Sequence, residues 1–100
     1  MHQQTKMCDF TPQVKAKIYE RDGGRCVYCG SNQGAPNAHF IPRSQGGLGI
    51  EQNGLTLCRE CHDRYDNGHG RIEMEAFFET YLRRIYPGWT RTRLIFKKYD

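Results

Sequence analysis

The chain contains no long hydrophobic run. Its apolar stretches fall well short of the ~18 residues that a membrane-spanning helix needs, and residues 1–10 lack the apolar segment of a secretory signal. Internal repeats and low-complexity tracts are absent as well. We therefore expect a cytoplasmic protein that has no membrane partner.

Hydrophobic residues are also scarce, at 37% of the 100 residues. A chain of this length forms one domain and buries only a modest core, so a bound structural metal would help it to fold. Aromatic residues make up 12% of the chain, which argues against disorder. We expect residues 1–10 to form a flexible polar arm and residues 11–100 to form the single domain.

An excess of one charge sign is nearly missing too. The formal net charge is +4, although ten of the fifteen cationic residues are arginine. Arginine binds phosphate through two parallel hydrogen bonds, so this bias favours a partner that carries phosphate groups. A basic surface that is merely solvated explains so small a net charge equally well.

Cysteine, in contrast, is plentiful. Four of the five cysteines form two Cys-x-x-Cys pairs, Cys26/Cys29 and Cys58/Cys61. Each pair supplies two thiolates from one turn, and two such turns complete a tetrahedral zinc site. A redox dithiol or two disulfides are the alternatives, but the chain lacks the thioredoxin-like context that a redox pair requires, and paired Cys-x-x-Cys units in a reducing cytosol indicate metal sites. We therefore expect a structural zinc ion and a reducing compartment, with Cys8 as a bystander thiol in the N-terminal arm.

Hydrophobic periodicity and capping residues predict three helices and two strands. Thr11 and Pro12 begin a helix that ends near Arg21. The other elements are strands over 37–41 and 55–57 and helices over 58–67 and 73–86. We expect the last helix to face the core with an apolar stripe of Met74, Phe77, Phe78, Tyr81, Leu82 and Ile85. Residues 89–100 fit a short helix or a strand equally well.

The most specific pattern spans residues 38–62. It begins Ala-His-Phe-Ile-Pro-Arg-Ser-Gln-Gly-Gly-Leu-Gly-Ile-Glu-Gln-Asn and ends Thr-Leu-Cys-Arg-Glu-Cys-His. Together with the upstream cysteine pair, it resembles the His-Asn-His (HNH) endonucleases, in particular small phage-type members with a four-cysteine zinc site. The resemblance covers residues 12–98. It implies an α+β fold with a zinc-stabilised ββα-metal (His-Me finger) core and flanking helices.

The resemblance also implies roles for individual residues. His39 would be the general base, Asn53 would tie the loop and help to fix that base, and His62 would bind a catalytic divalent ion such as Mg²⁺ or Mn²⁺. One position departs from the family pattern, because Ala38 stands where a metal-binding Asp or His is usual. The missing ligand must come from elsewhere in the chain or from water. Asp66 is our candidate, since it follows His62 by four residues and shares its helix face, and Asp63 is the weaker choice because the next position on a helix points elsewhere.

A protein of this kind would be a metal-dependent DNA endonuclease that hydrolyses phosphodiester bonds in a bacterial or phage-infected cell. Histidine suits the chemistry, because it titrates near neutral pH and can accept a proton from water. We expect the phosphate contacts to come from seven basic residues: Arg43, Arg59, Arg64, Arg91, Arg93, Lys97 and Lys98.

Two other functions stay open. A zinc-stabilised nucleic-acid-binding module that does not cleave, such as a phage packaging accessory, would explain Ala38. A protein-interaction module would instead use the helix that carries Phe77 and Tyr81, and its partner would be a second copy or a phage packaging protein. The presence of both His39 and Asn53 favours the nuclease, because a binding module needs no general base.

Overall fold

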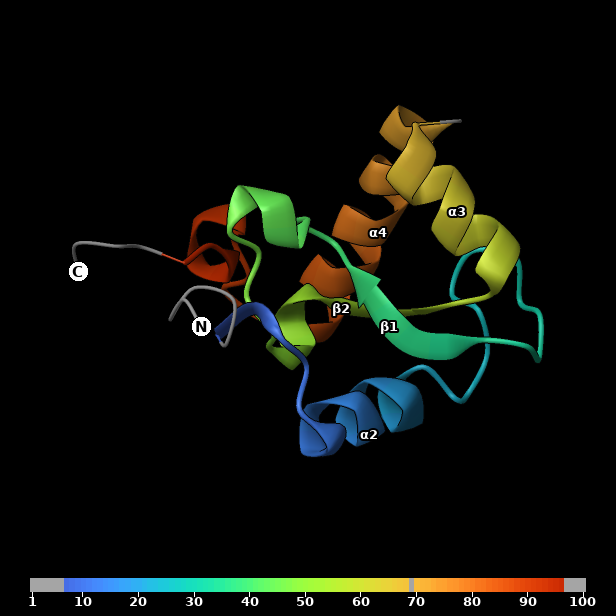
Figure 1. The fold of residues 1–100 in the computed structure, drawn as a ribbon, viewed down its shortest axis with the longest axis horizontal. Coiled ribbons are helices and arrows are strands. Elements are labelled where there is room, and N and C mark those ends of the chain that lie inside the picture. The colour runs from blue at the N-terminus through green and yellow to red at the C-terminus, as the bar shows by residue number, and fades with distance from the viewer. Residues whose placement is uncertain (1–6, 69, 97–100) are drawn as a thin grey trace.

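A two-stranded antiparallel sheet lies at the centre of the protein. The computed structural model describes residues 7–68 and 70–96. The strands β1 (Ala35–His39) and β2 (Gly54–Leu57) pair with His39 opposite Gly54. In Figure 1, α2 (Pro12–Arg21) runs below this hairpin, whereas α3 (Arg59–Asn67) and α4 (Arg71–Ile85) pack together above and behind it. This strand–strand–helix arrangement confirms the predicted α+β class.

The helix α2 begins as its sequence predicts. The side chain of Thr11 accepts a hydrogen bond of 3.2 Å from the backbone N–H of Val14, and Pro12 occupies the first helical position. The helix ends at Asp22, and its one fully buried side chain is Ile18. This residue lies on the side of the helix that contacts both strands.

An ion pair at the end of α2 holds that helix to β2. The guanidinium of Arg21 donates to the backbone carbonyls of Glu51 and Gly54 at 2.8 and 2.7 Å. The carboxylate of Asp22 accepts from the backbone N–H of Thr56 at 2.9 Å. The side chain of Asp22 is fully buried, so these partners are needed to offset its desolvation. Sequence patterns assign Asp22 only the role of a helix stop.

The helix α4 buries a narrower stripe than its periodicity predicts. Met74, Phe78 and Leu82 are fully buried, at a spacing of four residues. The prediction is wrong for Phe77, which is 46% exposed and meets the edge of Tyr28 with ring centroids 5.2 Å apart. Tyr81 is only partly buried and packs at the margin of the core. Within the described residues, no helix is both long and apolar enough to cross a membrane.

The two ends of the described chain pack against the loop between the strands. The expectation of a loose N-terminal arm is wrong for Met7–Phe10, because Cys8 is 1% exposed and Met7 accepts a hydrogen bond from Gly49. At the other end, η3 (Arg91–Leu94) is a 3-10 turn, and Ile95 then pairs with Gly47 in one β-bridge. The loop itself contains the short turns η1 (Arg43–Gln45) and η2 (Glu51–Asn53).

Candidate functional site

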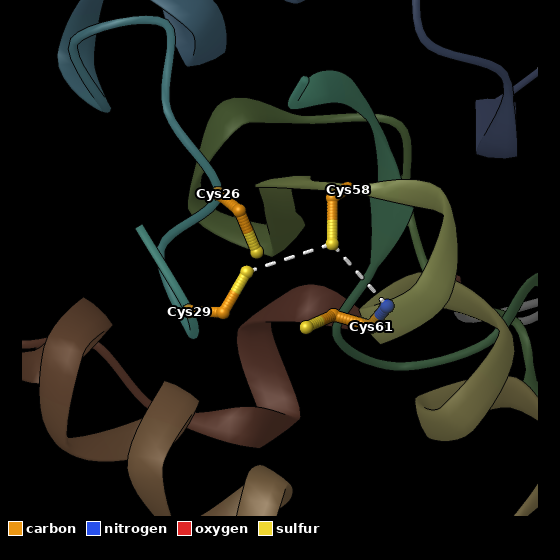
Figure 2. Close-up of side chains that lie close together, drawn as sticks. All are labelled: Cys26, Cys29, Cys58 and Cys61. Atoms are coloured by element: carbon orange, nitrogen blue, oxygen red, sulfur yellow. Dashed lines mark hydrogen bonds between the residues drawn. The ribbon is translucent and has the colours of Figure 1, made fainter. Parts of the chain in front are cut away.

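Four cysteine side chains converge where the turn after α2 meets the start of α3. Cys26 and Cys29 come from the turn, and Cys58 and Cys61 come from the end of β2 and the first turn of α3 (Figure 2). Their sulfur atoms all lie within 4.8 Å of one another, and Sγ of Cys29 is 3.6 Å from Sγ of Cys58. Tetrahedral ligands at zinc–sulfur distances of about 2.3 Å lie about 3.8 Å apart. The four thiols therefore fit the predicted metal site.

The electrostatics of this cluster favour a bound cation. Burial raises the pKa of Cys61, and the neighbouring sulfurs of Cys58 and Cys26 raise it further. Burial also acts to raise the pKa of Cys26, but hydrogen bonds from nearby backbone N–H groups lower it to about 7. Four thiols this close cannot all ionise without a bound cation, because the negative charges of the thiolates would repel one another. A divalent metal removes that obstacle, since a metal-bound thiol is deprotonated.

A separate cleft of about 760 Å³ lies between the loop after β1 and the end of α3. It brings together residues that are far apart in the sequence: Asn37, His39, Pro42, Arg43, Ser44, Gln45, His62, Asp66, Asn67, Gly68 and Arg71. Three of the predicted site residues, His39, His62 and Asp66, thus share one open, polar cavity. A cleft in which several polar and titratable side chains converge is the usual place for catalysis, so this cavity is the candidate catalytic site.

His39 projects from the end of β1 and is held from two sides. Its Nε2 atom lies 2.7 Å from the backbone carbonyl oxygen of Cys8. Its ring stacks on Phe10 with centroids 4.1 Å apart and an angle of 19° between the planes. Burial lowers the pKa of His39, and this effect outweighs the opposing effect of the Cys8 hydrogen bond. The imidazole is therefore neutral near pH 7, which is the form that accepts a proton.

Asn53 lies behind the cleft and joins the two ends of the loop. Its side-chain oxygen accepts from the N–H of Ile41 at 2.7 Å, and its amide donates to the carbonyls of Ile41 and Leu48 at 3.2 and 2.9 Å. Its own carbonyl accepts from the N–H of Phe40, the residue after His39. Asn53 is fully buried, so it acts on the cleft by holding the loop and not by touching a substrate.

His62 and Asp66 face each other on successive turns of α3. The Nε2 atom of His62 lies 3.2 Å from a carboxylate oxygen of Asp66, and their side chains are 30% and 55% exposed. Two ligands of one divalent ion lie about 3 Å apart when each is about 2.1 Å from it. The pair therefore fits a metal ion held by one nitrogen and one oxygen.

Ala38 has no atom that could bind a metal ion in the cleft. Its side chain is fully buried and lies opposite Leu55 on the core side of the hairpin. Its neighbours Asn37 and His39 are the ones that line the cleft, because alternate residues of a strand point to opposite faces. Asn37 is a residue that motif matching misses, and only the alternation along the strand points to it.

The basic residues expected to contact phosphate have different surroundings. Arg43 lines the cleft and pairs with one exposed carboxylate, that of Asp9, whereas Arg64 lies against the ring of Tyr28 at 5.8 Å. Arg91 is bound by two carboxylates, those of Glu75 and Glu79, and does not line the cleft. Arg59 and Arg93 are exposed, and Lys97 and Lys98 lie outside the described residues.

Arg71 is a cleft residue that sequence patterns do not identify. It lines the cavity beside Asp66, and its guanidinium lies 4.1 Å from the centre of the Tyr65 ring. It also donates to the backbone carbonyl of Tyr65, the residue before Asp66. The only hint in the sequence is that Arg71 follows the turn at Asn67-Gly68, which reverses the chain towards the preceding helix.

Comparisons with known proteins agree with this geometry. A family model described as HNH endonuclease matches residues 26–68, which contain the four clustered cysteines and every predicted catalytic residue. The chain is 39% identical over 66 residues to anaredoxin of Nostoc sp., covering 65% of this chain and 87% of that protein. It is 38% identical over 60 residues to the type IV methyl-directed restriction enzyme EcoKMcrA of Escherichia coli, covering 51% of this chain but only 22% of the enzyme. The matched span identifies residues 26–68 as a domain of the HNH endonuclease family.

Proposed function

We propose that the protein is a metal-dependent endonuclease that hydrolyses phosphodiester bonds in DNA. The observation that carries this proposal is the meeting of His39 with the His62–Asp66 pair in one open, polar cleft. A nucleophile-activating base and a pair of metal ligands are the two components that single-metal phosphodiester hydrolysis requires. A restriction enzyme among the relatives favours DNA as the nucleic acid.

His39 would act as the general base. A carbonyl oxygen can only accept a hydrogen bond, so the contact with Cys8 requires that Nε2 carries the proton. Nδ1 then keeps its lone pair and can take a proton from the water that attacks phosphorus. Asn53 keeps the backbone after His39 in place through the N–H of Phe40.

His62 and Asp66 would hold the catalytic ion. A bound Mg²⁺ or Mn²⁺ would stabilise the charge that develops on the leaving oxygen. Because Ala38 offers no donor, Asp66 becomes the anionic ligand, and its carboxylate oxygen suits such hard cations. Arg43 and Arg71 line the same cleft and would hold the flanking phosphates without selecting a sequence.

The test is a plasmid-nicking assay with added Mg²⁺, Mn²⁺ or Ni²⁺, comparing the natural protein with His39→Gln. Glutamine keeps an N–H that can donate to the Cys8 carbonyl, but it cannot act as a base. We expect the cleavage rate to fall by ~10²–10⁴-fold while DNA affinity stays within a few fold. Zinc content and thermal unfolding serve as folding controls. Cleavage by His39→Gln at the natural rate would rule out this role.

The second candidate is a zinc-stabilised module that binds nucleic acid without cutting it, and the buried methyl group of Ala38 favours it. A phage packaging accessory is one protein of this kind. It predicts that the natural protein binds DNA but leaves a plasmid intact at every metal concentration. None of the five cysteines forms a disulfide, and four of them form the metal cluster, so for either function we propose a reducing compartment such as the bacterial cytoplasm.

A further inference from the structure

The segment Met7–Phe10, which precedes the span matched by the family model, forms part of the wall behind His39. Its backbone is fixed by one hydrogen bond, in which the N–H of Gly49 donates to the carbonyl of Met7 at 2.9 Å. A Cβ atom at position 49 would overlap the backbone of Asp9, so this approach is possible only because residue 49 is glycine. Cys8 is 1% exposed, which anchors the segment in the protein interior.

The charged contact of this segment contributes little to its placement. Asp9 pairs with Arg43, but their side chains are 48% and 49% exposed. Ion pairs that exposed contribute about 0–1 kcal/mol. The buried thiol of Cys8, the Gly49 contact and the ring of Phe10 therefore hold the segment, and none of these depends on salt.

Two contacts from the segment constrain the His39 side chain: one fixes the plane of its ring, and the other fixes which ring nitrogen carries the proton. Phe10 stacks on the imidazole at 4.1 Å and fixes the plane of the ring. The carbonyl of Cys8 lies 2.7 Å from Nε2 and fixes which nitrogen carries the proton. Asn53 holds the backbone of the following residue but does not touch the imidazole, so the tautomer and the ring plane depend on the segment alone among the contacts described.

We propose that Met7–Phe10 positions the base: Phe10 sets the orientation of the His39 ring, and the Cys8 carbonyl holds it in the Nε2–H tautomer. The segment thus orients a side chain of the cleft, in addition to shielding the core from solvent. This inference rests on the proposed function only in assigning His39 as the base. The tautomer itself is a property of the protein without substrate.

The test variant is Phe10→Leu in the full chain. Phe10 also lies near Ile18, because a Cβ atom built at Gly54 meets both side chains. Leucine keeps an apolar side chain against this part of the core, so the fold survives while the stacked ring is lost. Tyr19→Leu is the matched control, because Tyr19 is an aromatic residue on α2 that is 46% exposed and outside the cleft.

Two measurements decide the outcome. In ¹⁵N-labelled protein, two-bond ¹⁵N–¹H correlations identify the His39 tautomer, and we expect pure Nε2–H in the natural protein and in Tyr19→Leu. We expect a mixture in Phe10→Leu, because an imidazole that is no longer stacked can turn away from the Cys8 carbonyl and lose the hydrogen bond that selects the tautomer. In the nicking assay we expect kcat to fall ~10-fold or more in Phe10→Leu, with KM within twofold, because misplacing a reacting group by about 1 Å costs as much as 10²-fold.

Several results would overturn the proposal. An Nδ1–H tautomer in the natural protein would do so directly, as would an unchanged tautomer in Phe10→Leu. Unchanged kcat, or a raised KM with unchanged kcat, would show instead that the segment is a cover or a DNA contact. If the natural protein fails to nick DNA, the proposed function falls, and the tautomer measurement still decides whether the segment orients His39.

Discussion

The cysteine cluster and the cleft are both candidate metal sites, yet they are built in opposite ways. The cluster takes four identical ligands from two short turns, and its sulfurs are all within 4.8 Å of one another. The cleft takes different side chains from β1, the following loop, α3 and α4, and its two proposed ligands, His62 and Asp66, are partly exposed. A complete ligand set holds a fold together, whereas an incomplete one leaves room for water and substrate.

The largest effect is expected from removing a ligand of the cysteine cluster. Cys61→Ser should abolish the cooperative fold, because in such a small domain metal binding supplies most of the folding free energy, ~10–16 kcal/mol in zinc-finger peptides at pH 7. Elemental analysis and circular dichroism measure zinc content and folding. Cys8→Ser is the control, since Cys8 lies outside the cluster and should leave one zinc per chain. A folded Cys61→Ser protein without zinc would contradict a structural role.

Removing a proposed metal ligand from the cleft should leave the fold intact. Asp66→Ala removes one of the two proposed ligands, so we expect the metal concentration for half-maximal nicking to rise by ~10-fold or more, with zinc content unchanged. Asp63→Ala on the same helix is the matched control, because Asp63 is exposed and does not line the cleft. If both variants titrate like the natural protein, water or a substrate phosphate must complete the coordination of the ion.

The pH dependence of cleavage should separate the cleft from the cluster. The base works in its neutral form, and burial lowers the pKa of His39, so activity should persist below pH 6.5 and be lost as the pH falls through the lowered value. The cleavage rate, DNA affinity and zinc content would be measured over the same pH range. An acidic midpoint above 6.5 would conflict with a buried base, and simultaneous loss of zinc would assign the change to the cluster.

The smallest effects concern two arginines that sequence patterns treat alike. Arg43→Gln should weaken DNA binding uniformly and lower the slope of log affinity against log salt by about 1, because one phosphate contact is lost. Arg91→Gln should leave that slope unchanged and lower thermal stability by about 1 kcal/mol, since Glu75 and Glu79 lose their shared partner. Equal salt slopes for the two variants would show that the cleft does not hold phosphate through Arg43.

The cysteine cluster could be predicted well because its geometry is local. Each Cys-x-x-Cys pair is separated by only two residues, so the turn at Gly30 and the first turn of α3 place both sulfurs of each pair with little freedom. The same holds for His62 and Asp66, whose spacing on a helix brings them to 3.2 Å. The ends of the predicted strands and helices lie within two residues of their observed bounds, because these elements also depend on short-range sequence patterns.

The family resemblance, the cluster of four cysteines and the polar residues of the motif thus follow from the order of the residues, because short spacings leave few backbone angles undetermined. Long-range packing alone establishes that Phe10 and the carbonyl of Cys8 hold His39, that Arg71 enters the cleft and that Arg91 is neutralised. These contacts join residues separated by up to tens of positions, and they depend on how whole elements pack. A backbone carbonyl, moreover, is present in every residue, so no pattern of side chains can single out the one that orients a catalytic ring.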